Sequence, residues 1–263
     1  MRERIDKVLE ILSRTGYRSV AELSADLGVS EMTIRRYLDR LEGQQLVKRT
    51  HGGAYTGQEM IEVDYRIRET VHREQKEAIG RAAWALVEPG ESIFIDAGST
   101  NSYLALAMDG SRRVTVVTVS TVVAQALEGR PNVETILLGG KVHGPSHSLV
   151  GPIPEEMIDK FRFTKAFLGA VGISLTDGFT QSNLDEVPVK KKVAANARQV
   201  VVLADSSKFN REVLVLFLRL DQVHTVITDS GITGEWRAAL EERGIRVIVA
   251  DEARPEARRG GER

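Results

Sequence analysis

The chain has 263 residues, of which 42% are apolar and 28% are charged, and its formal net charge is −1 at pH 7. This composition is typical of a globular protein with one large domain or two unequal ones. The absence of cysteine excludes disulfides, thiolate metal sites and cysteine nucleophiles. The longest apolar run, residues 213–218, is much shorter than the roughly 20 residues of a membrane-spanning helix. Because the first ten residues also lack a signal-peptide core, we expect a cytoplasmic protein that does not contact a membrane.

Three short helices are predicted near the N-terminus. The first spans residues 3–14. The second begins after Ser19, which together with Glu22 matches the pattern of a capping box, and it ends at Gly28. The third spans residues 31–41, where apolar residues recur at helical spacing. The short connection between the second and third helices is typical of a helix-turn-helix.

The outer face of the third helix is basic, and so is the segment after it. A β-hairpin with a glycine turn is predicted over residues 45–55, in the position of a wing. A recognition helix meets base edges, whereas basic wing residues contact phosphates. The residues that we expect to bind DNA are Ser30, Thr33, Arg35, Arg36, Arg40, Lys48, Arg49 and His51. The alternative is a three-helix module with solvated arginines, which the basic wing disfavours.

Strands and helices alternate in the rest of the chain. Strands rich in Val, Ile and Leu are predicted at 92–96, 114–118, 133–138, 165–170, 200–204, 223–228 and 246–249. Helices are predicted at 73–87, 101–108, 121–127, 184–197 and 235–243. Nearly continuous apolar strands are buried on both faces, so this pattern predicts an α/β domain with an open, Rossmann-like, mostly parallel sheet.

The predicted organisation has four segments. A winged helix-turn-helix domain occupies residues 1–57, and a polar linker or connecting helix follows at 58–72. The α/β domain spans 73–250, and a disordered tail rich in charge ends the chain at 251–263.

Small and hydroxyl-bearing residues follow several of the predicted strands. Ligands of open α/β sheets bind outside the carboxyl ends of the strands, and a helix N-terminus there suits an anion. Each fragment alone is explained by a cap, a turn or a surface ion pair, so the prediction depends on their combination. The residues that we expect to bind a phosphorylated effector are Asp96, Gly98, Ser99, Thr100, Thr118, Ser120, Gly139, Gly140, Gly172, Asp205 and Lys208.

The chain resembles the DeoR/GlpR family of bacterial repressors of sugar metabolism. In the N-terminal part, the Ser-x-x-Thr-Ile-Arg-Arg core and the Arg-Thr-His-Gly-Gly-Ala wing carry the resemblance. In the C-terminal part, it is carried by IFIDAGST, LLGG, VLADSSKF, SLVGP and KAFLGAVGI. The resemblance implies a C-terminal fold like that of ribose-5-phosphate isomerase and glucosamine-6-phosphate deaminase. It also implies double-stranded operator DNA as a partner and a phosphorylated sugar as effector.

Three positions depart from the family pattern. Tyr37 stands where the family usually has Asp, Ser99 replaces the first Thr of Gly-Thr-Thr, and Val119 replaces the Asn of Thr-Asn-Ser. Tyr37 is expected to change local packing or phosphate contacts. The loss of an amide at Val119 bears on which effector is bound.

A sugar-phosphate isomerase or deaminase with an accessory helical domain is the alternative function. Its candidate acid and base groups are Asp96, Asp177, Asp185 and Glu186. An operator-reading module fused to an enzyme is the less economical interpretation, and no pair of carboxylates stands at catalytic spacing, so we expect no catalytic residue. The spacing of His143 and His147 suits a metal, but the two lie in a Gly/Pro loop, so we expect neither a metal nor a cofactor.

One helix-turn-helix covers a single half-site, so we expect at least a homodimer held through the C-terminal domain. The apolar run at residues 213–218 is a candidate contact, although a buried strand explains it equally well.

Overall fold

The computed structural model describes residues 2–15, 17–44, 46–49, 53–55 and 65–250. The chain divides into two compact units, Met1–Val63 and Asp64–Arg263, and each is described by itself. The predicted tail and residues 58–64 of the predicted linker lie outside the described residues. The predicted domain boundaries therefore stay a prediction.

The first unit is a winged helix-turn-helix. Its two three-residue strands and one two-residue strand form an antiparallel sheet in the order β1-β3-β2. Its elements are α1 (Arg2–Thr15), β1 (Tyr17–Ser19), α2 (Val20–Leu27), α3 (Glu31–Gly43), β2 (Lys48–Arg49) and β3 (Gly53–Tyr55). The three predicted helices and the two strands of the wing are confirmed. Strand β1 was not predicted, because three residues are too few to show a periodicity and the strand exists only by pairing with β3.

Local side-chain chemistry holds the helix-turn-helix in shape. The Ser19 hydroxyl accepts a hydrogen bond from the Glu22 amide at 3.1 Å, and the Glu22 carboxylate accepts one from the Ser19 amide at 2.8 Å. The predicted capping box is therefore confirmed. Gly28 adopts the left-handed conformation, with φ at +61°, and Ser30 caps α3 by accepting from the Thr33 amide at 3.4 Å. A residue with a side chain would be strained at Gly28.

The second unit is built on a seven-stranded sheet in which every pairing is parallel, in the order β15-β14-β12-β9-β4-β5-β6. The strands are β4 (Ser92–Ile95), β5 (Val114–Thr118), β6 (Val133–Leu137), β9 (Phe163–Gly169), β12 (Ala197–Leu203), β14 (Thr225–Asp229) and β15 (Arg246–Ala250). These are the seven predicted strands, so the predicted open parallel sheet is confirmed.

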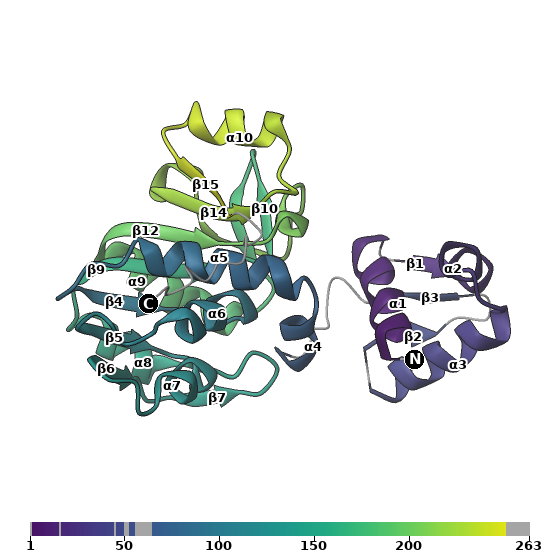
Figure 1. Cartoon of the computed structure of the whole chain (residues 1–263), viewed down its shortest axis with the longest axis horizontal. Coiled ribbons are helices and arrows are strands. Elements are labelled where there is room, and N and C mark those ends of the chain that lie inside the picture. The colour runs from purple at the N-terminus through teal and green to yellow at the C-terminus, as the bar shows by residue number, and fades with distance from the viewer. Residues whose placement is uncertain (1, 16, 45, 50–52, 56–64, 251–263) are drawn as a thin grey trace, which may run out of the picture. The chain divides into compact units, whose positions relative to one another are not determined.

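Helices cover both faces of this sheet (Figure 1). The helices of this unit are α4 (Tyr65–Thr70), α5 (Arg73–Ala85), α6 (Ser99–Ala107), α7 (Thr121–Leu127), α8 (Pro152–Ile158), α9 (Val187–Ala195) and α10 (Gly234–Glu241). Alternate strand residues enter two apolar cores: Ile93 and Ile95 face α5, α6 and α7, whereas Phe94 faces the core that α8, α9 and α10 complete. Gly80 lets α5 lie directly on α6, because a Cβ there would stand 2.5 Å from the carbonyl oxygen of Tyr103.

The predicted helix over residues 184–197 is wrong at its start. Residues Leu184–Glu186 form a 3₁₀ turn, and α9 begins only at Val187. The reason is Pro188 in the first turn of α9. It has no N–H to continue a helix that began earlier, and its ring clashes with the carbonyl of the residue four positions before it.

Two small antiparallel sheets complete the second unit. One has the order β10-β11-β13, and the other pairs β7 with β8. Their strands are β7 (Lys141–His143), β8 (Ser148–Val150), β10 (Gly172–Ser174), β11 (Gly178–Gln181) and β13 (Val215–Leu218). The apolar run at 213–218 therefore contains the edge strand β13. None of the helices in the described ranges is long and apolar enough to cross a membrane.

Candidate functional site

The exposed face of α3 carries the predicted DNA-reading side chains. Arg35, Arg36 and Arg40 are exposed, and the half-buried Thr33 hydroxyl lies 3.0 Å from the Ser30 hydroxyl. Arg35 pairs with Glu31 one turn earlier at 2.9 Å. Among the described residues, neither Arg36 nor Arg40 forms an ion pair. Both guanidinium groups are thus available to a base edge or a phosphate.

Tyr37, which replaces the family's usual Asp, belongs to the core of the first unit. Only 4% of it is exposed, and the Arg36 guanidinium stands 5.9 Å from its ring centroid. The departure therefore adds apolar packing beneath the arginine face of α3.

The wing is tied to the recognition helix. Arg49 pairs with Asp39 of α3, and its backbone amide donates to the Glu42 carboxylate at 3.0 Å. Lys48 lies opposite Tyr55 in the β2–β3 pair. The predicted contact His51 lies outside the described residues. Arg49 thus has carboxylate partners on α3, and the role of Lys48 in DNA binding stays a prediction.

Met32 was not among the predicted residues; it is an apolar residue in the first turn of α3 that is 79% exposed. It lies one turn before Arg35 and Arg36, on the same face of the helix. Its position outside the apolar stripe of α3 was the signal that could have found it.

The second candidate site lies where the order of strands reverses. From β4 the chain adds β5 and β6 on one side of the sheet and β9, β12, β14 and β15 on the other. Such a switch point opens a crevice beyond the carboxyl ends of the strands. Asp96 follows β4 there, and its Oδ2 accepts a hydrogen bond from the Gly169 amide at the end of β9 at 3.0 Å.

Lys190 closes this arrangement from α9. Its ammonium pairs with Asp96 and donates to the Gly169 carbonyl oxygen at 3.0 Å, and the Lys190 and Asp96 side chains are 2% and 4% exposed. Lys190 was not among the predicted site residues. The signal was available, because Lys190 is in helical register with the buried Val187 and Val193.

The start of α6 lies beside a buried side-chain amide that has no hydrogen-bond partner among the described residues. Gly98 has a φ of +143°, and α6 begins at Ser99 without a side-chain cap. Asn101 is fully buried, and in the described part of the chain neither its amide nitrogen nor its amide oxygen has a hydrogen-bond partner. A Cβ on Gly98 or Gly169 would stand 3.7 or 3.0 Å from the Asn101 nitrogen. The predicted Gly98-Ser99-Thr100 turn thus lies beside an unsatisfied amide that the sequence analysis missed.

A second group of charges gathers beyond β12 around Asp205. Its Oδ1 accepts from the Ser207 amide at 3.1 Å, whereas its buried Oδ2 has no partner among the described residues. Burial opposes ionisation, but the charges of Lys208 and Lys76 lower the pKa of Asp205 to about 2. With β9 between β12 and β4, this group lies two strand spacings, about 10 Å, from Asp96.

Cations outnumber carboxylates in this group. Lys76 is 3% exposed, and its burial, together with the nearby charges of Lys208 and Arg68, lowers its pKa to about 7. Burial also lowers the pKa of Arg211, which Asp205 partly offsets. Within the described ranges, the Lys208 and Arg211 side chains form no hydrogen bond or ion pair. The arrangement can attract an anion.

The remaining predicted effector residues have structural contacts. The Thr118 hydroxyl donates to the Ile95 carbonyl at 2.6 Å, and Ser120 caps α7 by accepting from the Val123 amide at 3.2 Å. Cβ atoms at Gly139, Gly140 and Gly172 would stand 3.3 Å from Ile153, 2.9 Å from Pro154 and 2.4 Å from the Arg211 carbonyl oxygen. Their role in ligand binding stays a prediction.

Two of the acid and base candidates of the alternative function, Asp96 and Glu186, line one small pocket, but both have other partners. Asp177 and Asp185 are exposed, and Asp96 is paired with Lys190. Both oxygens of the buried Glu186 accept hydrogen bonds, one from the Ser148 hydroxyl at 2.8 Å and the other from the Gln181 amide. Among the described residues no cluster of His, Asp and Glu could hold a metal, and the His147 ring packs edge-on against Tyr65 at 5.6 Å.

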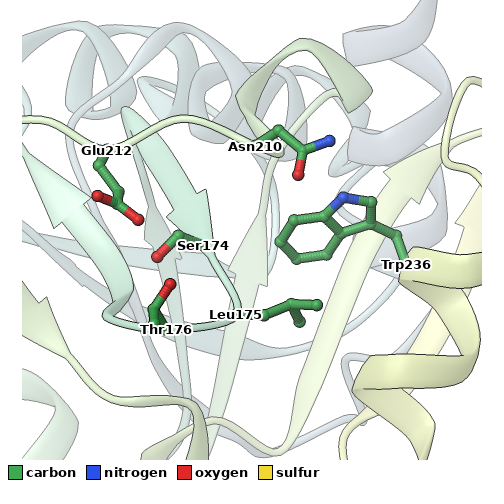
Figure 2. Close-up of a pocket in the computed structure, with 6 residues that line it drawn as sticks. All are labelled: Ser174, Leu175, Thr176, Asn210, Glu212 and Trp236. Carbon is green, nitrogen blue, oxygen red and sulfur yellow. The ribbon is translucent and has the colours of Figure 1, made fainter.

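A separate pocket of about 410 Å³ opens beside α10, and none of its lining residues was predicted. Figure 2 shows Trp236 and Leu175 on one side of it and Glu212, Ser174 and Thr176 on the other. The segment that follows Lys208 reaches this pocket through Asn210, whose φ is +55°.

Both units of the chain match known protein families. A DeoR-like helix-turn-helix domain matches residues 4–59, and a DeoR C-terminal sensor domain matches residues 71–230. The winged helix-turn-helix and the α/β domain that matches a sensor domain thus define a DNA-binding transcriptional regulator. The chain belongs to the DeoR family. This is a family of transcriptional regulators and not of enzymes, as the sequence analysis predicted.

Full-length relatives include regulators from an archaeon and from bacteria. The transcriptional regulator GlpR of Haloferax volcanii is 34% identical over 94% of this chain and 96% of its own length. The glycerol-3-phosphate regulon repressor of Escherichia coli is 30% identical over 87% and 90%, and the regulator IolR of Bacillus subtilis is 29% identical over 94% and 98%.

Among solved structures, ribose 5-phosphate isomerase A of Methanocaldococcus jannaschii is similar, with a TM-score of 0.38. It is 20% identical, over 51% of this chain and 53% of that one. A likeness of this degree carries no argument about activity.

Proposed function

We propose that this protein is a cytoplasmic repressor of carbohydrate genes, which binds double-stranded operator DNA and is controlled by a phosphorylated sugar. The relatives support the gene class, because one is named for a glycerol-3-phosphate regulon and another is named as a putative repressor of an aga operon. The exposed arginine face of α3 supports the contact with DNA.

The observation that carries the effector proposal is the unsatisfied Asn101 amide at the start of α6. A buried amide without partners costs free energy, so its retention beside a glycine turn favours a ligand that supplies both partners. The first amides of α6 and the helix dipole suit a phosphate at Gly98-Ser99-Thr100. An amide that both donates and accepts suits sugar hydroxyls.

The charged groups beyond β12 would contact different parts of the ligand. Lys76 and Lys208 supply positive charge for the phosphate. Asp205 is a better acceptor for a sugar hydroxyl than Asp96, because the Asp205 Oδ2 has no partner among the described residues whereas Asp96 is paired with Lys190. This assignment supports a ligand that spans the crevice from β4 to β12.

The Ser99→Asp variant tests the effector site. A carboxylate at the start of α6 occupies the place proposed for the phosphate, so operator release by sugar phosphates should be lost while operator affinity without ligand stays unchanged. The control is Ser111→Asp, an exposed position before β5 at the other end of the sheet. A free sugar that releases operator as well as its phosphate does, or a normal response in Ser99→Asp, overturns the effector proposal.

We also propose a homodimer formed through the second unit. The edge strand β13 supports it, because Leu216 in that strand is 39% exposed and the adjacent Leu214 is 66% exposed, while Phe217 is buried. Exposed apolar side chains on an edge strand favour pairing with another copy. Light scattering of wild type and of Leu214→Glu tests this. A monomeric wild type at operator-binding concentration overturns the dimer, and an unchanged dimer in Leu214→Glu overturns the contact.

A further inference from the structure

Helix α4 is the first described element of the second unit in chain order. Two side chains near the proposed ligand site, Lys76 and Tyr103, donate hydrogen bonds to carbonyl oxygens in α4 or just after it. The Lys76 ammonium on α5 donates to the carbonyl oxygen of Arg68 in α4 and to that of Val71, just beyond it, the latter at 2.7 Å. These two carbonyls lie at the C-terminal end of α4, where helix carbonyls have no partner within the helix. Lys76 thus serves as the cap of α4.

Two further attachments hold α4, one from α6 and one from the segment between β7 and β8. The Tyr103 hydroxyl on α6 donates to the Glu69 carbonyl oxygen at 3.3 Å, four residues along the helix from Ser99. The Pro145 carbonyl oxygen accepts from the Tyr65 amide at 2.8 Å and from the Arg68 guanidinium at 3.4 Å. A movement of α5 or α6 would therefore change the hydrogen bonds that these helices make to α4.

The Lys76 ammonium is the group that α4 and the ligand site share. It is buried, and the charges of Asp205 and Lys208 act on it from the end of β12. An ammonium has three N–H donors, and α4 uses two of them. A phosphate oxygen is a stronger acceptor than a peptide carbonyl, because the hydrogen bond is then charged on both sides.

We propose that α4 is the element through which the ligand acts on the DNA-binding domain, and that Lys76 is its positioning residue. An anion bound between α6 and Lys208 draws the Lys76 ammonium away from the carbonyls of Arg68 and Val71 and releases the C-terminal end of α4. The proposal rests on the proposed ligand site. In this proposal the ligand binds more tightly when the C-terminal end of α4 is released than when Lys76 caps it. Any coupling between two sites requires such a difference in affinity between two states.

Hydrogen–deuterium exchange of the full-length protein tests the capping role without a ligand. Lys76→Met removes the ammonium and keeps the length of the side chain, so the amides of residues 65–71 should exchange at least tenfold faster than in wild type. Tyr103→Phe removes one hydrogen bond to α4 and should accelerate them about threefold. Lys192→Met on α9 is the control: its ammonium pairs with the exposed Asp159, and exchange in α4 should not change.

Inorganic phosphate, compared with chloride at equal ionic strength, tests the coupling. In wild type, saturating phosphate should slow exchange at residues 99–102 and accelerate it at least fivefold at residues 65–71. In Lys76→Met, phosphate should produce no further acceleration at 65–71.

The outcomes separate the two proposals. No protection of residues 99–102 by phosphate or by any of a panel of sugar phosphates overturns the ligand site. Protection there with unchanged exchange in α4 overturns the coupling alone. If Lys76→Met does not fold, Tyr103→Phe tests whether these hydrogen bonds hold α4. Exchange in α4 equal to wild type in Tyr103→Phe would contradict that role.

Discussion

The Lys190 ammonium joins two neighbouring strand ends, because it pairs with the Asp96 carboxylate beyond β4 and also donates to the Gly169 carbonyl at the end of β9. Both charged side chains are almost fully buried. Asp96→Asn or Lys190→Met should therefore lower the free energy of unfolding by about 3–5 kcal/mol, because each leaves one buried charge without a partner. Urea denaturation of each variant measures the loss.

The double variant Asp96→Asn with Lys190→Met is the control for this pair. Since it leaves no buried charge, it should be more stable than either single variant. A double variant with the sum of the two single losses contradicts a coupled pair.

Asn101→Leu should stabilise the fold and impair the response to ligand. Leucine is close to asparagine in size and removes two buried polar atoms that have no partner, so the free energy of unfolding should rise by about 1–3 kcal/mol. The loss of hydrogen bonds to the ligand should weaken the effector at least tenfold. Thermal unfolding and operator release by sugar phosphates measure the two effects, and Asn101→Leu with wild-type release contradicts the role of the amide.

Arg36→Ala and Lys48→Ala should impair DNA binding in different ways. Arg36 is exposed on α3 without an ion pair among the described residues, so its loss should cost about 1–3 kcal/mol on the specific operator if it reads a base. Lys48 lies in the wing, so its loss should weaken binding to all sequences and reduce the salt slope by about one unit. Fluorescence anisotropy at several salt concentrations, with an operator selected from random DNA, measures both. Unchanged affinity in both variants contradicts the interface.

Met32 should contribute specificity through a thymine methyl group. It is 79% exposed on the arginine face of α3, and the thymine methyl is the apolar group of the major groove. Replacing each operator thymine by uracil in turn should weaken wild-type binding about fivefold at one position or more, as expected for a buried methyl group. The Met32→Ala variant should lose this difference. Equal sensitivity of both proteins to uracil contradicts the contact.

Lys76 should make the stability of the second unit depend on pH above neutrality. Its pKa falls from 10.5 to about 7 because of burial and because of the nearby Lys208 and Arg68 charges, against the attraction of Asp205 and Glu69. Between these values the unfolded chain holds a proton that the folded chain lacks, so the free energy of unfolding should rise with pH, by at most about 1.4 kcal/mol per unit. Below pH 7 both states are protonated and this contribution no longer changes.

The comparison with Lys76→Met isolates this effect. Urea unfolding at pH 7, 8 and 9 should give a rising difference in stability between wild type and variant. Parallel pH profiles for the two proteins would show that Lys76 titrates normally.

Local patterns predicted most of the fold. The capping box at Ser19 and Glu22, the left-handed Gly28 and the seven apolar strands depend on contacts within a few residues or on a repeat along one element, so the sequence shows them directly. The short strands β1, β10 and β11 escaped prediction, because strands of three or four residues exist through their partners and have little periodicity of their own.

The candidate site was predicted only in part, because only some of its residues belong to a local pattern. The Gly98-Ser99-Thr100 turn and Asp205 were found because each follows an apolar strand. Lys76 and Lys190 were missed, although both lie on the apolar stripes of their helices, because a lysine among valines is not recognisable as buried until its partner is known.

The sequence by itself thus determined the seven strands of the main sheet, most of the longer helices, the helix-turn-helix and the family, since these depend on local periodicity and on contiguous motifs. Only the tertiary structure decided that Lys190 meets Asp96, 94 residues away in the chain, and that Lys76 joins α4 to the charges around Asp205. The physical reason is that burial and pairing of charge depend on which strand ends become neighbours. The strand order of the folded sheet sets that, and no single segment encodes it.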